Sequence, residues 1–224
     1  MGYHIDFGII VQSYPVLLRG LLVTIELAVP SIAIGFILGF FVALARLSRS
    51  GGVRYPAQCY VELFRDAPVL IQLIWFYYAF PILIGVQLTP YQAALLGLAL
   101  NTSAYSSEIF RGGIQSIAKG QWEGAKALGM RPAAVLRRIV LPQVVKRMLP
   151  AFTNRAIEVT KMSSLASILS VHELMYQGRL LSATYYHPLE IFTTVAFIYF
   201  ILIYPGSYFS SRLERRLARS DYQA

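Results

Sequence analysis

Five long apolar stretches, divided by shorter basic segments, run along this sequence of 224 residues. Hydrophobic residues make up 56% of the chain and charged residues 14%, whereas a typical soluble domain has about a quarter charged residues. A chain of this size has too much apolar surface for water to be its only solvent. The sequence therefore predicts an all-α integral membrane protein.

The apolar stretches are long enough for membrane-spanning helices, each of which needs roughly 20 mostly apolar residues. The predicted spans cover about 17–47, 60–84, 91–117, 148–171 and 189–209. Gly35 and Gly39 in the first span have a spacing that lets another helix approach closely. Residues 1–6 lack the basic segment of a signal peptide, so we expect insertion to depend on the internal spans. The whole chain, 1–224, is expected to be a single transmembrane domain.

Basic residues are concentrated on one side of these spans. They lie around the connection between the first two spans, between the third and fourth, and after the fifth, where the arginines are Arg212, Arg215, Arg216 and Arg219. The opposite side has only Arg19 and Arg179. The positive-inside rule therefore predicts an external N-terminus and a cytoplasmic C-terminus. Because the bases do not form a patch with interleaved aromatic residues, we expect no nucleic-acid partner despite the net charge of +9.

The segment at about 119–142, between the third and fourth predicted spans, is too polar to cross a membrane and too regular for a loose loop. Residues 122–128 are expected to form a short helix, and Gly129 then occupies the position of a left-handed residue that ends a helix. Pro132 is placed to open a second helix, which we expect to stop near Leu141 and Pro142. The pattern predicts a cytoplasmic helix–turn–helix, and taken alone it fits a hairpin packed on its own bundle equally well.

This segment resembles the signature of permease subunits of type I ABC importers, which is Glu-Ala-Ala, three residues, Gly, nine residues and Ile-x-Leu-Pro. The matching residues are Glu123, Gly124, Ala125, Gly129, Ile139, Leu141 and Pro142. Gly124 in place of the usual Ala is the one departure, and it weakens the helix by up to about 1 kcal/mol. The segments 60–78, 108–130 and 137–143 look like the polar amino-acid subfamily, and the similarity extends over about 17–217.

The resemblance implies a mechanism and a set of partners. Two permease subunits pair as a homodimer or heterodimer in a bacterial inner membrane, and each cytoplasmic hairpin docks on an ABC ATPase subunit. An extracytoplasmic binding protein delivers a polar amino acid, such as His, Arg, Gln, Glu or an opine. ATP and Mg are bound by the ATPase, so no cofactor is expected in this chain. Gly129 is the expected hinge of the hairpin, because glycine adopts a positive φ at little cost.

Ionisable residues inside the predicted spans are the candidate functional residues. Arg155, Glu158 and Lys161 follow one another at three-residue intervals in the fourth span, which leaves one positive charge in excess. A cation among serine hydroxyls suits a substrate carboxylate, and Glu158 suits a substrate ammonium. We therefore predict a substrate pathway that includes Glu158, Lys161 and Ser164, with a purely structural network as the alternative. Weaker candidates on the third span are Asn101, Ser103 and Tyr105.

Other features exclude several classes of protein. Glu62 with Arg65, and Glu108 with Arg111, are expected to be structural ion pairs between residues three apart. The three histidines share no ligand spacing, so we expect no metal site. The sequence has no evident nucleophile–base set or phosphate-binding glycine loop, so no catalytic residue is expected. A self-sufficient secondary amino-acid transporter or channel is the remaining alternative, and the hairpin spacing argues against it.

Overall fold

The structure is a computed structural model that describes residues 5–221, with side chains as far as Arg215. Residues 1–4 of the segment used for the signal-peptide prediction, and the side chains of Arg216 and Arg219, lie outside this description. Every regular element in the described part is a helix, as predicted. The α-helices are α1 Gly8–Arg46, α2 Gly51–Asp66, α3 Val69–Tyr78, α4 Phe80–Ile84, α5 Pro90–Gln115, α6 Lys119–Ala127, α7 Pro132–Val135, α8 Leu141–Met162, α9 Leu174–Tyr185 and α10 Pro188–Asp221.

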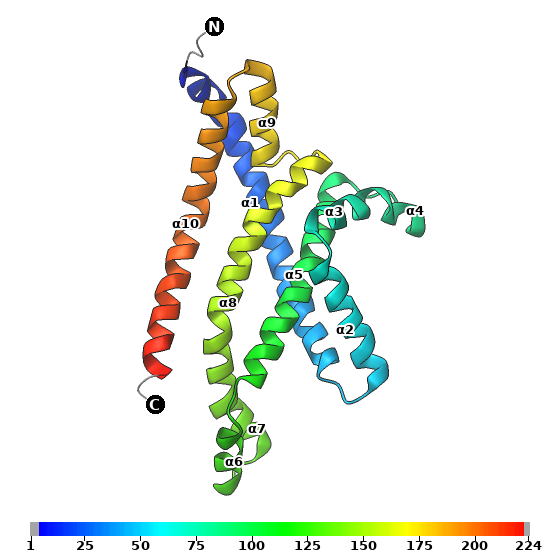
Figure 1. Cartoon of the computed structure of the whole chain (residues 1–224), viewed down its shortest axis with the longest axis vertical. Coiled ribbons are helices and arrows are strands. Elements are labelled where there is room, and N and C mark those ends of the chain that lie inside the picture. The colour runs from blue at the N-terminus through cyan, green and yellow to red at the C-terminus, as the bar shows by residue number, and fades with distance from the viewer. Residues whose placement is uncertain (1–4, 222–224) are drawn as a thin grey trace.

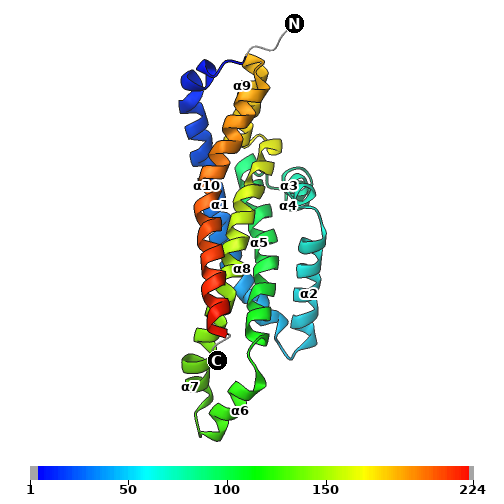
Figure 2. The ribbon, with the colours of Figure 1, turned by 60° about the vertical axis from the view of Figure 1, so that its left-hand side comes forward.

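Long helices run side by side along the length of the molecule (Figures 1 and 2). Helices α1, α5, α8 and α10 form this bundle, and α2, α3 and α4 lie against one side of it. The hairpin of α6 and α7 projects at one end, whereas α9 lies at the other, beside the start of α1. The last turns of α10 point toward the hairpin end, so the start of α1 and the end of α10 lie at opposite ends of the bundle.

The predicted close approach at Gly35 and Gly39 is confirmed in the contact between α1 and α5. A Cβ atom on Gly35 would lie 2.5 Å from the Cβ of Thr102, and one on Gly39 would lie 2.5 Å from the Cβ of Ser106. Any larger residue would force the two helices apart. The polar residues opposite are small and buried, and Thr102 donates to the carbonyl of Leu98 in its own helix.

The predicted span 60–84 is not one continuous helix. Helix α2 ends at Asp66, and Ala67 adopts an extended backbone with ψ of 137°. Proline disfavours the helical conformation in the residue before it, so Pro68 accounts for this break. Gly85 then ends α4 with a φ of +69°. The three short helices fold back beside the bundle (Figure 1).

Two of the described helices could cross a membrane by length and apolar content, namely Gly8–Arg46 and Pro188–Arg215. Helix α3 is apolar but has only 10 residues. Helices α5 and α8 are long enough for a span but carry polar and charged side chains. The count of five spans stays a prediction.

The expectation that the second hairpin helix stops near Leu141 and Pro142 is wrong. Helical structure continues from Pro132 through a π-helical segment, Leu136–Val140, into α8. Pro142 lacks an N–H and would crowd the carbonyl four residues before it in an ordinary helix. The wider π turn relieves this conflict, and the N–H of Leu141 reaches back five residues to the carbonyl of Leu136. The hairpin and α8 are therefore joined by an unbroken helix.

Candidate functional site: a projecting hairpin and a charged cleft

The hairpin turn has the left-handed glycine that its sequence predicts. Gly129 has a φ of +70°, and a Cβ atom there would meet nothing within 4 Å. The N–H of Met130 donates to the carbonyl of Ala125 at 3.1 Å, which is the six-to-one hydrogen bond that typically closes a helix at such a glycine. The need for glycine is therefore conformational, because the position has ample space.

The hairpin buries a small apolar core and leaves other apolar side chains in the open. Ala125 and Val135 lie in this core with Val144 of α8. In contrast, Leu128 is 82% exposed and Leu136 is 51% exposed. The hairpin packs on its own bundle, but it also has an apolar face that nothing in the described chain covers.

The residues of the family signature are divided between this core and the exposed face. Ala125 is buried and Ile139 is half-buried against the same core. The exposed members are Glu123, Gly124, Gly129, Leu141 and Pro142.

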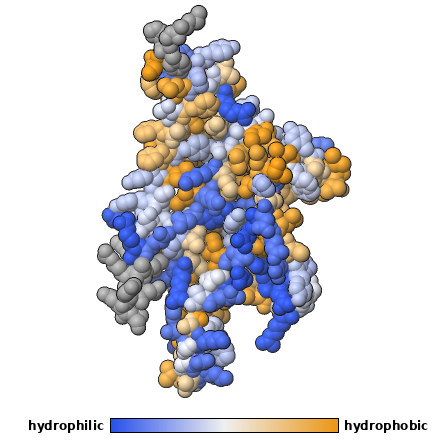
Figure 3. Space-filling model, viewed as in Figure 1, coloured by the Kyte–Doolittle hydropathy of each residue, from blue (hydrophilic) through white to orange (hydrophobic). Residues whose placement is uncertain are grey.

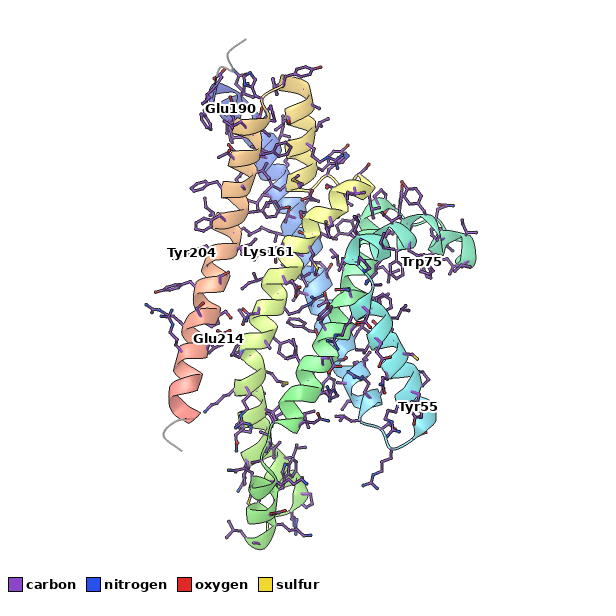
Figure 4. All side chains as sticks on the ribbon, viewed as in Figure 1. Tyr55, Trp75, Lys161, Glu190, Tyr204 and Glu214 are labelled. Atoms are coloured by element: carbon purple, nitrogen blue, oxygen red, sulfur yellow. The ribbon has the colours of Figure 1, made fainter. Side chains whose placement is uncertain are left out.

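A charged cleft of about 660 Å³ lies farther along α8. Its lining comes from α2, α5, α8 and α10 and consists of Arg65, Tyr105, Glu108, Ile109, Ala151, Asn154, Arg155, Ile157, Glu158, Lys161 and Ser207. Figure 4 shows Lys161 on α8 and Glu214 on the neighbouring α10. Of the predicted pathway residues, Tyr105, Glu158 and Lys161 therefore meet in one cleft.

Arg155 is the most buried charge in the cleft, with 3% of its side chain exposed. Its guanidinium contacts Glu158 at 2.7 Å, donates to the side-chain oxygen of Asn101, and lies 4.1 Å from the ring centre of Tyr105. The Nε atom has no hydrogen-bond partner in the described structure. A buried donor without a partner is costly, so this arginine has unused capacity to bind an anion.

Lys161 has no ion-pair partner among the described side chains, so the predicted excess cation is present. The partner of Glu158 is Arg155, one of the two cations that lie three residues from it. Glu158 itself is 55% exposed and borders the open cleft. Two cations and one carboxylate therefore line this part of α8.

The other predicted pathway residues do not line the cleft. Asn101 lies behind it, accepting from Arg155 and donating to the carbonyl of Phe64 at 2.8 Å. The hydroxyl of Ser103 is paired with that of Tyr60, and the hydroxyl of Ser164 donates to the carbonyl of Lys161. Asn101 is positioned to orient Arg155, whereas the two serines satisfy local contacts.

Glu108 connects α1, α2 and α5 at the side of the cleft that is nearer the hairpin. It contacts Arg111 at 2.7 Å, as predicted, and also Arg46 at 2.8 Å and Arg65 at 3.2 Å. The predicted pair of Glu62 and Arg65 is wrong, because Arg65 turns to Glu108 on α5. Glu62 instead accepts a hydrogen bond from Gln58 at 2.9 Å.

A buried carboxyl that the sequence prediction missed lies between α8 and α9. Glu173 is fully buried and caps α9 by accepting hydrogen bonds from the N–H groups of Met175 and Tyr176. It also accepts from the hydroxyl of Tyr199 at 2.8 Å. Burial raises the pKa of Glu173 above its ordinary value. Its position just before an amphipathic helix was the available signal, since acidic side chains are common N-caps, though aspartate more than glutamate.

Among the described residues, no group of three or more histidine, cysteine, aspartate or glutamate side chains could hold a metal ion. The candidate site is built from ion pairs, an aromatic ring and hydroxyls. Such a set can bind and orient a charged solute.

A helical bundle with a projecting hairpin and an open charged cleft is consistent with a membrane transport subunit. The chain belongs to the family described as "Binding-protein-dependent transport system inner membrane component", which matches residues 35–219.

Individual relatives match nearly end to end. The chain is 34% identical to the arginine transport system permease protein ArtQ of Bacillus subtilis (strain 168), covering 97% of this chain and 100% of ArtQ. It is 41% identical to the octopine transport system permease protein OccM of Rhizobium meliloti, covering 84% of this chain and 80% of OccM. A solved structure described as an amino acid ABC transporter with histidines is 33% identical, with a TM-score of 0.88, and the match covers 96% of this chain and 100% of that one.

Proposed function

We propose that this chain forms the translocation pathway for a polar amino acid or a close derivative in a type I ABC importer. It couples that movement to ATP hydrolysis by a separate ATPase subunit. The family membership supports the role of a permease subunit in a bacterial inner membrane. The named relatives that transport arginine and octopine support an amino-acid substrate, because both molecules carry an α-amino-acid group.

The proposed topology has five spans, with the N-terminus outside and the C-terminus in the cytoplasm. Helices α2, α3 and α4 together replace the second continuous span. Helices α5 and α8 are spans with low apolar content, because small polar residues of α5 pack against α1 and α2 and charged residues of both helices line the cleft. The basic residues of the hairpin lie at the same end as the last turns of α10, in agreement with one cytoplasmic face (Figure 1).

The charge pattern of the cleft is the observation that carries the proposal. A free amino acid has a carboxylate and an ammonium a few ångströms apart. We assign the carboxylate to Lys161 and Arg155, and the ammonium to Glu158, while the ring of Tyr105 packs against the Arg155 guanidinium. Asn101 keeps Arg155 in place, and Ser103 and Ser164 are assigned to the polar surroundings of the pathway.

The side chain at position 162 separates this chain from the usual pattern of the family it resembles. Met162 stands where an aspartate is common, directly after Lys161. Met162 packs against an apolar core and does not line the cleft. The absence of this negative charge removes a basis for assigning a cationic side chain to the substrate.

The proposed partners are a second permease subunit, identical or homologous, two ABC ATPase subunits and an extracytoplasmic binding protein. The coupling residues are Glu123, Gly124, Ala125, Gly129, Ile139, Leu141 and Pro142, which lie on or directly under the exposed hairpin face. The helix that begins at Pro132 continues to Met162. A movement of the hairpin is therefore transmitted along one helix to Arg155, Glu158 and Lys161.

Substitution of the unpaired lysine tests the proposal. Lys161→Met in the complex reconstituted into proteoliposomes is expected to reduce amino-acid uptake at least tenfold, while assembly and basal ATP hydrolysis persist. Lys146→Met, an exposed lysine on the same helix outside the cleft, is the control and should transport normally. Wild-type uptake by Lys161→Met would remove Lys161 from the pathway. Uptake by the permease without any ATPase would support the secondary transporter instead.

A further inference from the structure

A second, separate pocket lies at the hairpin-ward ends of α1, α2 and α5, with a volume of about 370 Å³. Its lining consists of Arg46, Leu47, Arg54, Gln58, Arg111 and Gln115. Three arginines and two amides surround the space, and no carboxylate is part of the lining. Figure 3 shows hydrophilic side chains gathered over the lower half of the molecule, where these helix ends lie.

The nearest carboxylate does not neutralise this pocket. Glu108 contacts the guanidinium groups of Arg46, Arg65 and Arg111. Of these arginines, Arg46 and Arg111 line the pocket, and with Arg54 they give three positive charges against one carboxylate. The excess of two positive charges favours an anion from outside the chain.

The arginines are held in place and still have donors to offer. Arg46, with 11% of its side chain exposed, is fixed by Glu108 at 2.8 Å and by Ser107. Arg111 is fixed by Glu108 and by Gln115 at 2.8 Å. A guanidinium has five N–H donors, so both groups retain donors beyond these contacts. A rigid pair of guanidinium groups suits the geometry of a phosphate.

Arg54 completes the pocket from the start of α2. It is exposed, and its guanidinium lies 5.0 Å from the ring centre of Tyr55. Arg54 also donates to the hydroxyl of Tyr55 at 3.3 Å, and both contacts are on the surface, where an anion can replace them.

Leu47 in the pocket lining is 40% exposed, and other exposed apolar side chains lie on the same helices. On α1, Phe41 is 60% exposed and Leu44 is 47% exposed, and on α2 Val53 is 48% exposed. Figure 4 shows Tyr55 at the hairpin-ward end of α2, and the hairpin itself projects well beyond this level in Figure 1. The pocket therefore lies at the boundary between the apolar and the basic surface of these helices. It is closer to the predicted bilayer than the hairpin, which is the proposed ATPase contact.

We propose that this pocket binds the phosphate of an anionic phospholipid from the cytoplasmic leaflet, with the acyl chains against the apolar surface of α1. The proposal rests on the proposed topology, which places these helix ends on the cytoplasmic side. Basic pockets between helices at this face are suited to lipid headgroups, and each arginine near the surface contributes to the attraction. A free phosphate shares the chemistry of the headgroup but makes no use of the apolar border.

Native mass spectrometry of the full-length chain, purified with its co-purifying subunits and stripped of lipid, tests this assignment. Phosphatidylglycerol is expected to bind at a concentration about fivefold or more below that of phosphatidylcholine. Arg54→Gln should weaken phosphatidylglycerol binding about fivefold, and Arg54→Glu should weaken it further. Arg49→Gln is the matched control, because Arg49 lies in the connection just before α2, is exposed and does not line the pocket.

Several outcomes would overturn the assignment. Equal binding of the two lipids, or equal losses in Arg54→Gln and Arg49→Gln, would show only diffuse surface charge. Displacement of the lipid by inorganic phosphate would identify a site for free anions. Loss of the ATPase subunits from Arg54→Gln with lipid binding intact would identify a protein contact. Lipid binding is measured without transport, so a chain that binds phosphatidylglycerol but imports nothing contradicts the proposed function alone.

Discussion

One continuous helix, Pro132–Met162, joins the second arm of the hairpin to the charged cleft, yet the two regions expose opposite kinds of side chain. In the hairpin, Leu128 is 82% exposed and no described residue covers it. In the cleft, Arg155 is 3% exposed and retains a donor without a partner. An exposed apolar side chain gains most from a protein that covers it permanently, whereas an under-paired charge gains most from a charged solute. The two regions are therefore suited to different partners, and the helix between them connects the two binding events.

Substitution at the hairpin turn should have the largest effect on transport. Gly129→Asp places a side chain on a residue with a φ of +70° and adds a negative charge to the proposed docking face. We expect membrane insertion to persist and amino-acid uptake to be abolished. Uptake assays in whole cells, with the membrane content of the permease measured in parallel, check both parts.

A second glycine provides the control for this variant. Gly85 has nearly the same backbone conformation, with a φ of +69° and nothing within 4 Å of an added Cβ, but it lies after α4, far along the chain from the hairpin. Gly85→Asp should carry the same backbone strain and retain uptake. If both variants lose uptake equally, the loss reflects general strain, and the hinge role of Gly129 is refuted.

Substitutions in the cleft, unlike those at the hairpin turn, should lower the stability of the fold as well as transport. Arg155→Gln removes the contacts with Glu158 and Tyr105, and we expect it to lower the free energy of unfolding by about 1–3 kcal/mol. If Asn101 acts by holding Arg155, then Asn101→Ala should have a smaller effect in the Arg155→Gln background than alone. The coupling free energy from the double-mutant cycle should be about 0.5–3 kcal/mol. Additive losses would show that Asn101 acts independently of Arg155.

Two serine substitutions, one at an exposed and one at a buried apolar residue of the hairpin, distinguish an effect on ATPase docking from an effect on folding. Leu128→Ser should leave the melting temperature of the isolated permease unchanged and weaken ATPase binding about tenfold, since covering a leucine contributes roughly 1.5–3 kcal/mol. Val135→Ser, in the small core under the turn, should instead lower the stability of the hairpin. Normal ATPase affinity in Leu128→Ser would exclude the exposed face from docking.

Features set by neighbouring residues could be predicted from the sequence. The left-handed turn at Gly129 and the helix start at Pro132 each depend on residues at most a few positions apart. The close approach at Gly35 and Gly39 needed only the spacing of two small residues. Each of these was confirmed.

Features set by tertiary packing could not be predicted in the same way. Arg65 was assigned to Glu62 because the two lie three residues apart, but the competing partner, Glu108, comes from another helix. The contact of Asn101 with Arg155 joins residues 54 positions apart. The effect of a proline could not be predicted either. The helix ends before Pro68, whereas it continues through Pro142 by means of a π turn. A proline alone therefore signals a conflict without specifying how the packing resolves it.

The smallest predicted effect tests whether the one departure from the family signature matters to the hairpin or to the cleft. Gly124 is exposed, and a Cβ atom there would meet nothing within 4 Å, so Gly124→Ala introduces no clash. Alanine should stabilise α6 by up to about 1 kcal/mol, which hydrogen exchange of the amides of Lys119–Ala127 would detect as slower exchange. Because the cleft is held by contacts among α2, α5 and α8, its substrate affinity should not change. A change in substrate affinity in Gly124→Ala would mean that the stability of the hairpin affects the cleft through the connecting helix even without ATP hydrolysis. The hairpin and the cleft would then not be independent.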